Sequence, residues 1–125
     1  MEECAKNRQL LANEFKDCQK SIIAIGDEIR QSIIITLLEN DIVGMRVGEI
    51  TEKTHLSRPA VSHHLKILKD ANIISMRKKG TKNYYYIDIN KTEWQKLTIL
   101  INHINELIEK ASKERYPNNY LGEED

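Results

Sequence analysis

The side chains best suited to binding chemistry fall in one stretch, Leu56–Asp70, which reads LSRPAVSHHLKILKD. Its inward-facing positions recur at helical spacing and predict a helix whose buried stripe is Val61, His64, Leu65 and Leu68. The opposite face carries short hydrogen-bonding groups and cations, namely Arg58, Ser62, His63, Lys66 and Lys69. Such a face suits a nucleic-acid groove. An ordinary amphipathic surface helix has the same periodicity, so the stretch alone leaves both interpretations open.

The elements around this stretch predict how it is positioned. Ser57 is a good N-cap residue, and Pro59 falls in the first turn, where its missing N–H costs nothing. Val47–Thr54 is predicted to be a shorter helix, joined to the first stretch by a turn at Thr54–Leu56. Two short helices joined in this way, the second longer and basic, form a helix-turn-helix.

A β-hairpin is predicted directly after the helix-turn-helix. Ile73–Lys79 and Tyr84–Ile89 are β-rich runs on either side of a Gly/Asn turn. The tip is cationic, with Arg77, Lys78, Lys79 and Lys82, and a basic hairpin in this place is typical of the wing of a winged helix. Alternation along the strand puts Tyr84 and Tyr86 on one face and Tyr85 on the other. We expect Tyr85 to pack against the helices, and Tyr84 or Tyr86 to contact a DNA backbone.

The formal net charge of the 125-residue chain is zero, which by itself argues against a nucleic-acid partner. The charge is unevenly distributed, however. Residues 46–82 contain nine Lys or Arg and three Asp or Glu, a net charge of +6, which leaves −6 for the remainder. A basic centre between acidic ends gives an electrostatic footprint despite the neutral total.

Long helices are predicted on both sides of this centre. The first runs from about residue 5 to Gly26, and Asp27 caps a second helix with inward residues Ile29, Ile33, Ile34, Leu37 and Leu38. The last helix, about 91–112, has more apolar surface than one small core needs, which suggests a two-fold dimer. The predicted interface residues are Leu11, Phe15, Cys18, Trp94, Leu97, Ile101, Ile104 and Ile108. The predicted architecture is a mainly α winged helix-turn-helix with about five helices and a two-stranded wing, spanning 1–114, with a flexible acidic tail at 115–125.

Composition excludes several classes. No apolar run approaches the ~20 residues of a membrane span, and the N-terminus lacks the basic-then-apolar order of a signal peptide, so we expect a cytoplasmic protein. Two cysteines without a CxxC make a disulfide framework unexpected. The sequence shows no paired carboxylates, nucleophile–base pair or phosphate-binding glycine loop, and His63 and His64 project from different helix faces. We therefore predict no enzyme activity.

With these motifs in place, the run from Ile25 to Ile89 resembles the ArsR/SmtB family of winged-helix transcriptional repressors. The resemblance is carried by IGDEIRQSIIITLL, by VGEITEKTHLSRPAVSHHLKILKDANII and by RKKGTKNYYYI. It implies a homodimer formed by the first and last helices, which binds an inverted repeat in double-stranded DNA and blocks transcription. It also implies release from DNA when an inducer binds.

Two metal sites of the family were compared with this sequence. One requires two cysteines at the start of the first helix of the helix-turn-helix, where Met45–Glu49 has none. The other lies on the last helix. His103 and Glu106 match its second half, whereas Asn90 and Thr92, which are poor ligands, occupy the first half. No cofactor and no metal are therefore predicted, with His103 and Glu106 kept as weak candidates.

The cysteines are the other candidate sensors. Redox or metal sensing by Cys4 or Cys18 across a dimer is one interpretation. A half-buried Cys18 and an inert Cys4 is the other. The inducer, whether small molecule, metal or redox signal, is not identified by the sequence.

The turn between the two helices also departs from the family, which commonly has Gly before the Leu-Ser pair. This chain has His55 there. We predict that His55 adopts the left-handed conformation, which His tolerates better than most residues.

The predicted function is a sequence-specific, DNA-binding transcriptional repressor. Arg58, Ser62 and His63 are the candidates for base edges, because they project from the N-terminal half of the helix. Further predicted DNA contacts, mainly to phosphates, are Ser57, Pro59, Lys66, Arg77, Lys78, Lys79, Lys82 and Tyr84. The alternative is a winged-helix module whose basic face meets an acidic protein partner.

Overall fold

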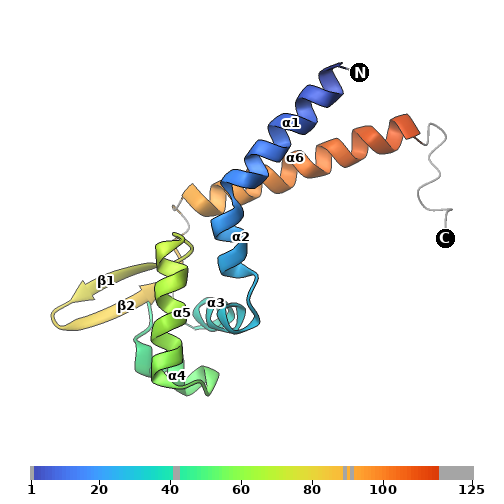
Figure 1. The fold of residues 1–125 in the computed structure, drawn as a ribbon. Coiled ribbons are helices and arrows are strands. Elements are labelled where there is room, and N and C mark those ends of the chain that lie inside the picture. Colours follow the sequence, from blue (N-terminus) through green and yellow to red (C-terminus); the bar gives the residue numbers. More distant parts are fainter. Residues whose placement is uncertain (1, 41–42, 89, 91, 116–125) are drawn as a thin grey trace. The chain divides into compact units, whose positions relative to one another are not determined.

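The computed structural model describes residues 2–40, 43–88, 90 and 92–115, which form six helices and one antiparallel hairpin (Figure 1). The elements are α1 (Glu2–Asp17), α2 (Gln19–Ile25), α3 (Glu28–Glu39), α4 (Val47–Thr54), α5 (Arg58–Asp70), β1 (Ser75–Lys79), β2 (Lys82–Tyr86) and α6 (Thr92–Arg115). The predicted fold class, mainly helical with a small hairpin, is confirmed. The predicted count of five helices is wrong, and the predicted tail lies, except for Arg115, outside the described residues.

The extra helix results from a break at Cys18, where one continuous helix was expected. Cys18 has φ −97° and ψ 0°, and its carbonyl accepts a bond from Ile22 that opens α2. Its side chain is buried, at 3% exposure. The same residue begins a new packing unit, since the chain divides into a winged unit (Cys18–Gln95) and a helical unit (residues 1–17 and 96–125).

The winged unit has its core where α3, α4 and α5 contact one another in pairs. The side chains that are essentially inaccessible are Ile33, Ile50, Val61, Leu65, Leu68, Ile73 and Ile74. Asp27 caps α3 as predicted, because its carboxylate accepts a bond from Arg30 N at 3.0 Å. That bond is the main reason the pKa of Asp27 lies below its ordinary value.

The inward stripe of α3 is narrower than predicted. Ile33, Ile34 and Leu37 are buried, whereas Ile29 and Leu38 are exposed at 39% and 66%. Buried Thr36 takes part of the inner face, and its hydroxyl donates to Ser32 O at 2.8 Å. A polar residue can lie there because its own helix accepts the hydrogen bond.

The first turn of α6 belongs to the winged unit and is held there by two polar contacts. Trp94 Nε1 donates to Ile73 O at 2.8 Å, and Ser21 Oγ donates to Glu93 Oε2 at 2.6 Å. Trp94 therefore joins the start of α6 to the segment before β1.

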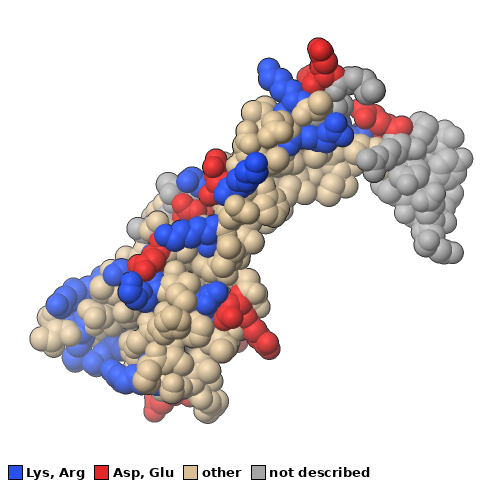
Figure 2. All heavy atoms as spheres, viewed as in Figure 1, with Lys and Arg blue, Asp and Glu red and all other residues tan. Residues whose placement is uncertain are grey.

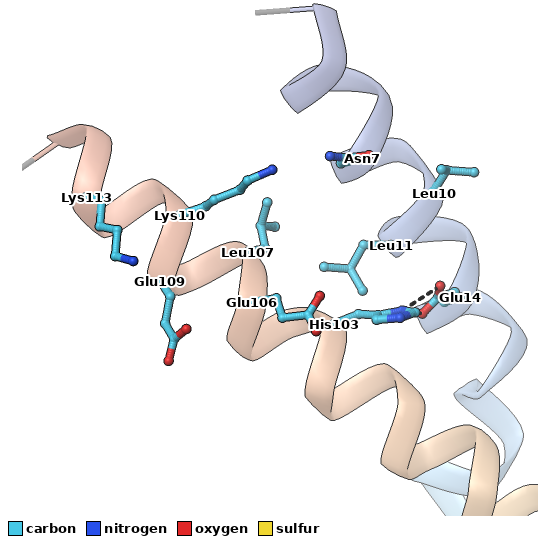
Figure 3. A pocket seen from close by; sticks show the side chains of 10 residues that line it. All are labelled: Asn7, Leu10, Leu11, Glu14, His103, Glu106, Leu107, Glu109, Lys110 and Lys113. Carbon is cyan, nitrogen blue, oxygen red and sulfur yellow. Dashed lines mark hydrogen bonds and ion pairs between the residues drawn. The ribbon is translucent and has the colours of Figure 1, made fainter.

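The helical unit contains α1 and the part of α6 from Lys96 onward. The two helices meet where His103 Nδ1 approaches both carboxylate oxygens of Glu14, at 2.7 and 2.8 Å. Beside this pair lies an open cavity of about 480 Å³, lined on the apolar side by Leu10, Leu11 and Leu107 (Figure 3). None of the described helices has the length and apolar character needed to cross a membrane.

Candidate nucleic-acid interface

The turn that sets α5 against α4 depends on His55, which has φ 60° and ψ 22°. The predicted left-handed conformation is confirmed. His55 N donates to Thr51 O at 2.9 Å, and Thr54 Oγ1 donates to Ile50 O at 2.7 Å. The first of these bonds satisfies a carbonyl that the end of α4 would otherwise leave unpaired.

Helix α5 begins as predicted. Ser57 is its N-cap, and Ser57 Oγ accepts a bond from Ala60 N at 3.3 Å, with Pro59 in the first turn. Its last turn is followed by Asn72, which has φ 58°, in the left-handed region. Both ends of the helix are therefore fixed by local sequence.

The predicted outward face of α5 is exposed throughout. Its exposed members are Ser57, Arg58, Pro59, Ser62, His63, Lys66 and Lys69. The inward residues Val61, Leu65 and Leu68 have no exposed surface. His64, predicted to be core, is half-buried instead, because it contacts the guanidinium of Arg30 rather than packing only among apolar side chains.

Two cations of α5 have neighbours that the sequence did not reveal. Gly48 of α4 lies beside Arg58, since a Cβ at Gly48 would stand 3.6 Å from Nη1 of Arg58. Lys66 Nζ donates to Asp70 Oδ2 at 3.0 Å, and that bond lowers the pKa of Asp70. Lys66 must therefore give up its bond to Asp70 before it can bind a phosphate. Arg58 lies where α4 and α5 meet.

The hairpin has a fixed register that separates its cations by face. Arg77 pairs with Tyr84, Lys79 with Lys82, and Lys78 with Asn83. Because cross-strand partners share a face and neighbours alternate, Arg77, Lys79, Lys82, Tyr84 and Tyr86 project from one face. Lys78, Met76 and Tyr85 project from the other. Three of the four predicted wing cations therefore share one surface.

On that cationic face Arg77 is held by aromatic rings. Its Cζ lies 5.7 Å from the ring centroid of Tyr84 and 5.9 Å from that of Tyr86. Both distances are within the range of cation–π attraction. The two tyrosines thus have a role within the wing, and all three tyrosines are half-buried.

A backbone bridge to the wing was missed by the sequence analysis. Met45 N donates to Tyr85 O and Tyr85 N donates to Met45 O, both at 2.8 Å. Gly44, at φ 122°, precedes this bridge, and a Cβ there would lie 3.1 Å from Tyr84 Cβ. Glycine is needed at this position for both its conformation and the close approach of the wing.

Lys and Arg side chains gather at the lower left of Figure 2, where Figure 1 places the hairpin. Arg77, Lys78, Lys79 and Lys82 are all exposed. The exposed outer face of α5 belongs to the same unit. The segment with a net charge of +6 is thus folded entirely within the winged unit.

The residues predicted to form a dimer differ in exposure. Cys18 and Leu97 are buried within the single chain, and Leu11, Trp94 and Ile104 are half-buried. Phe15, Ile101 and Ile108 are exposed at 44%, 62% and 58%. Only the second and third groups retain apolar surface for a partner.

The weak metal candidates lie on α6. His103 contacts Glu14 as described, and Glu106 lines the same cavity. Within residues 2–40, 43–88, 90 and 92–115 there is no group of three or more His, Cys, Asp or Glu that could hold a metal ion. The described residues therefore give no support to a metal site there.

A helix-turn-helix followed by a basic hairpin is the architecture of a winged helix-turn-helix protein. Residues 28–76 match the family described as bacterial regulatory protein, arsR family. The transcriptional repressor SdpR of Bacillus subtilis is 39% identical over 66% of this chain and 87% of that protein. An uncharacterized HTH-type transcriptional regulator of Methanocaldococcus jannaschii is 45% identical over 51% of this chain and 70% of that protein.

A solved structure of an ArsR family transcriptional regulator has a similar fold, with a TM-score of 0.61. The two sequences are 20% identical, and the match covers 73% of this chain and 89% of the solved chain. The chain belongs to the ArsR family.

Proposed function

We propose that the protein is a homodimeric repressor that binds an inverted repeat in double-stranded DNA and is released by an inducing signal. The observation that supports DNA reading best is the outer face of α5. It exposes Arg58, Ser62 and His63, while Val61, Leu65 and Leu68 on the opposite side have no exposed surface. A side chain with several hydrogen-bonding atoms, held on a rigid helix, can distinguish base edges in the major groove.

The wing would contact phosphates rather than bases. Its face with Arg77, Lys79 and Lys82 has three exposed cations on five-residue strands. Tyr84 on that face could add a hydroxyl contact. Phosphate contacts orient a protein on the duplex without specifying its sequence.

A dimer is supported by apolar spacing in the helical unit. Leu97, Ile101, Ile104 and Ile108 follow one another at intervals of four, three and four residues. This is the spacing of a helix seam that packs against another helix. On α1, Leu11 and Phe15 are also four residues apart. With Ile101 and Ile108 exposed in the single chain, we assign this seam to a second copy.

Two α5 helices in such a dimer would enter successive major grooves about 34 Å apart. The repressor role is proposed from the similarity to SdpR, which is a transcriptional repressor. Blocking transcription needs only that the bound dimer cover a promoter.

The experiment is selection of binding sequences from a random duplex pool, followed by titration at several salt concentrations. We expect an inverted repeat and a log–log salt slope of roughly −0.9 for each phosphate contact. Arg58→Ala should relax the preference at one base position in each half-site, at a loss of about 1–3 kcal/mol. Selection of no sequence, or a flat salt response, contradicts the proposal and would favour a protein partner for the basic face.

A further inference from the structure

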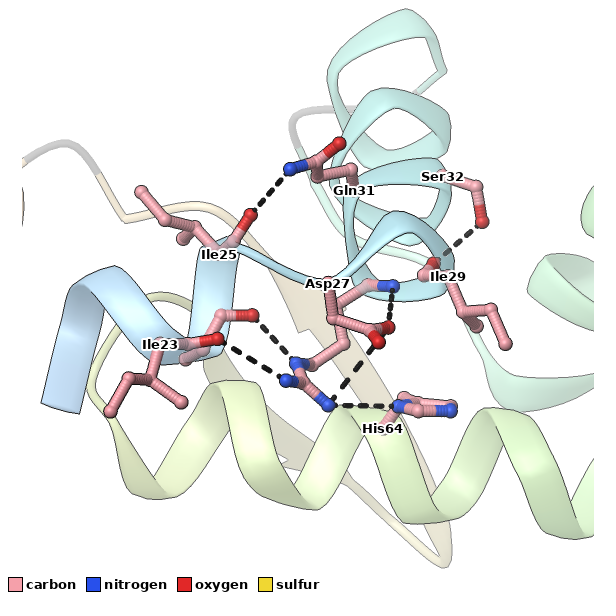
Figure 4. A network of polar contacts seen from close by, with 9 residues as sticks. Ile23, Ile25, Asp27, Ile29, Gln31, Ser32 and His64 are labelled. Carbon is pink, nitrogen blue, oxygen red and sulfur yellow. Dashed lines mark hydrogen bonds and ion pairs between the residues drawn. The ribbon is translucent and has the colours of Figure 1, made fainter.

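The guanidinium of Arg30, on α3, contacts four other residues of the winged unit, and Figure 4 labels three of them, Ile23, Asp27 and His64. Its Nε donates to Ala24 O at 2.6 Å and its Nη2 donates to Ile23 O at 3.2 Å. Its Nη1 lies 3.3 Å from Nδ1 of His64 and 4.0 Å from Oδ2 of Asp27. One guanidinium therefore joins the last carbonyls of α2 to the recognition helix α5.

These contacts are largely buried. The side chain of Arg30 is only 12% exposed. Carbonyls at a helix C-terminus carry partial negative charge and favour a cation. Gln31, the next residue, donates to Ile25 O at 2.8 Å. Three consecutive carbonyls of α2 are thus satisfied by α3, and Arg30 extends the junction to α5.

The contact with His64 fixes the state of that imidazole. Arginine has only donors, so a hydrogen bond at this contact requires Nδ1 of His64 to present its lone pair, which is the neutral ring with its proton on Nε2. Burial is the main cause that lowers the pKa of His64, and the charge of Arg30 acts in the same direction. Asp27 acts in the opposite direction, and a charged His63 would lower it further.

His64 is also next to the surface proposed to read DNA. The ring of His63 lies edge-on to that of His64, with centroids 5.2 Å apart. His63 is exposed, and Val61 and Leu65 anchor the same turn in the core. A change at His64 therefore acts on the same turn of α5 that carries Ser62 and His63, two of the candidates for contacts with bases.

We propose that Arg30 is a positioning residue for the recognition helix, and that protonation of His64 breaks their contact and weakens sequence-specific DNA binding. This inference rests on the proposed function. When His64 gains a proton, its Nδ1 becomes a donor facing a guanidinium, so the hydrogen bond is lost and two positive charges are in contact. The junction between α2, α3 and α5 then loosens, and α5 is less well held for reading bases.

The sign of the effect on stability follows from linkage. A histidine whose pKa is lowered in the folded state binds fewer protons than in the unfolded chain. Its stabilising contribution is present above the ordinary value of 6.5 and is lost as the pH falls through the lowered value.

The test uses His64→Asn, which places an amide oxygen near the position of Nδ1 and cannot be protonated there. His and Asn have similar helix propensity. His63→Asn is the matched control at the neighbouring, exposed position. Arg30→Lys keeps the charge but cannot bond to both α2 carbonyls and His64 together. Imidazole ¹⁵N shifts of the wild-type protein should first show His64 unprotonated at Nδ1 at pH 7.5.

The closing measurement is affinity for the duplex selected by the wild-type protein, at pH 7.5 and 5.5 and constant ionic strength. Relative to His64→Asn, the wild type should lose about 3- to 10-fold in affinity on acidification, because the loss of one hydrogen bond typically changes an equilibrium by roughly that factor. His63→Asn should keep that loss. Arg30→Lys should bind the selected duplex more weakly at pH 7.5 with nearly unchanged binding to random duplex.

Each contrary result is distinct. Equal pH dependence in the wild type and His64→Asn, or a protonated Nδ1 at pH 7.5, overturns the inference while leaving the proposed function intact. Arg30→Lys that folds and binds like the wild type also overturns it. If the wild-type protein selects no duplex, the proposed function fails, and the inference fails with it.

Discussion

The two units of this protein differ in how many apolar side chains a single chain buries in each. Of the 15 buried apolar residues in the described part of the chain, 13 lie in the winged unit and two, Leu97 and Leu100, lie in the helical unit. The winged unit also ties its elements together by polar contacts, at Arg30 and at the Met45–Tyr85 bridge. The helical unit has the Glu14–His103 pair beside an open cavity of about 480 Å³.

This difference indicates which function each unit can perform alone. A recognition helix must be rigid before it meets DNA, because each mobile side chain or turn would lose entropy on binding. The winged unit buries Val61, Leu65 and Leu68 of α5 completely within one chain, and this packing restrains the helix. The helical unit leaves Ile101 and Ile108 exposed, and the second copy proposed above would cover them.

The largest effect on the free energy of unfolding should come from a cavity-forming substitution in the core of the winged unit. Leu65→Ala removes a side chain with no exposed surface and should lower the free energy of unfolding by about 2–5 kcal/mol. Ile108→Ala, at 58% exposure, should cost far less in the monomer. Urea denaturation at several protein concentrations measures both, since a cost at Ile108 that grows with concentration reports association. Equal costs at every concentration would contradict the contrast between the units.

The second effect concerns the helical unit. Ile101→Glu should convert the protein to a monomer, because a carboxylate would have to be buried without a partner. Losing the linkage between half-sites should reduce affinity for an inverted repeat by about 100-fold or more, as expected when a second site is no longer tethered. Light scattering and the DNA titration measure the two consequences.

Leu38→Glu is the matched control for that change. Leu38 is exposed at 66%, close to the 62% of Ile101, but it lies on α3 in the winged unit. Its substitution should leave the molar mass unchanged. A monomer produced by Leu38→Glu and not by Ile101→Glu would move the interface to the winged unit.

The features of the fold that were predicted correctly from the sequence depend on residues close to one another along the chain. The bounds of α4, the caps Asp27 and Ser57, and the conformation of His55 were predicted correctly. All of these depend on residues within about one helical turn, where side-chain caps and backbone conformation are set by local chemistry. Local sequence is therefore sufficient for the helix-turn-helix.

The features that were missed depend on pairings distant in sequence. Arg30 and His64 are 34 positions apart, and the Met45–Tyr85 bridge joins the loop before α4 to β2. The break at Cys18 lies where one packing unit ends and the other begins, although the helical periodicity continues through it. Which apolar positions stay exposed, such as Ile29 and Leu38, likewise follows from tertiary packing and not from periodicity.

A smaller effect separates the two faces of the wing. Lys79→Ala should weaken binding to all sequences alike and reduce the salt slope by about 0.9, because Lys79 shares a face with Arg77 and Lys82. Lys78→Ala removes the same charge from the opposite face and should leave the slope nearly unchanged. Titrations on selected and random duplexes measure both variants. A larger change for Lys78→Ala would mean that the other face of the hairpin meets the phosphates.

The smallest effect should come from the turn between α4 and α5. His55 holds φ 60°, a conformation that costs roughly 1–2 kcal/mol for most side chains and that β-branched residues adopt least readily. His55→Val should therefore lower the free energy of unfolding by about 1 kcal/mol. His55→Gly should be neutral or slightly stabilising, because glycine adopts this conformation without strain. Urea denaturation of the two variants gives both values, and light scattering should show no change in association, since the turn belongs to the winged unit. If Val were tolerated as well as Gly, the left-handed turn could not be what holds α5 at its angle to α4.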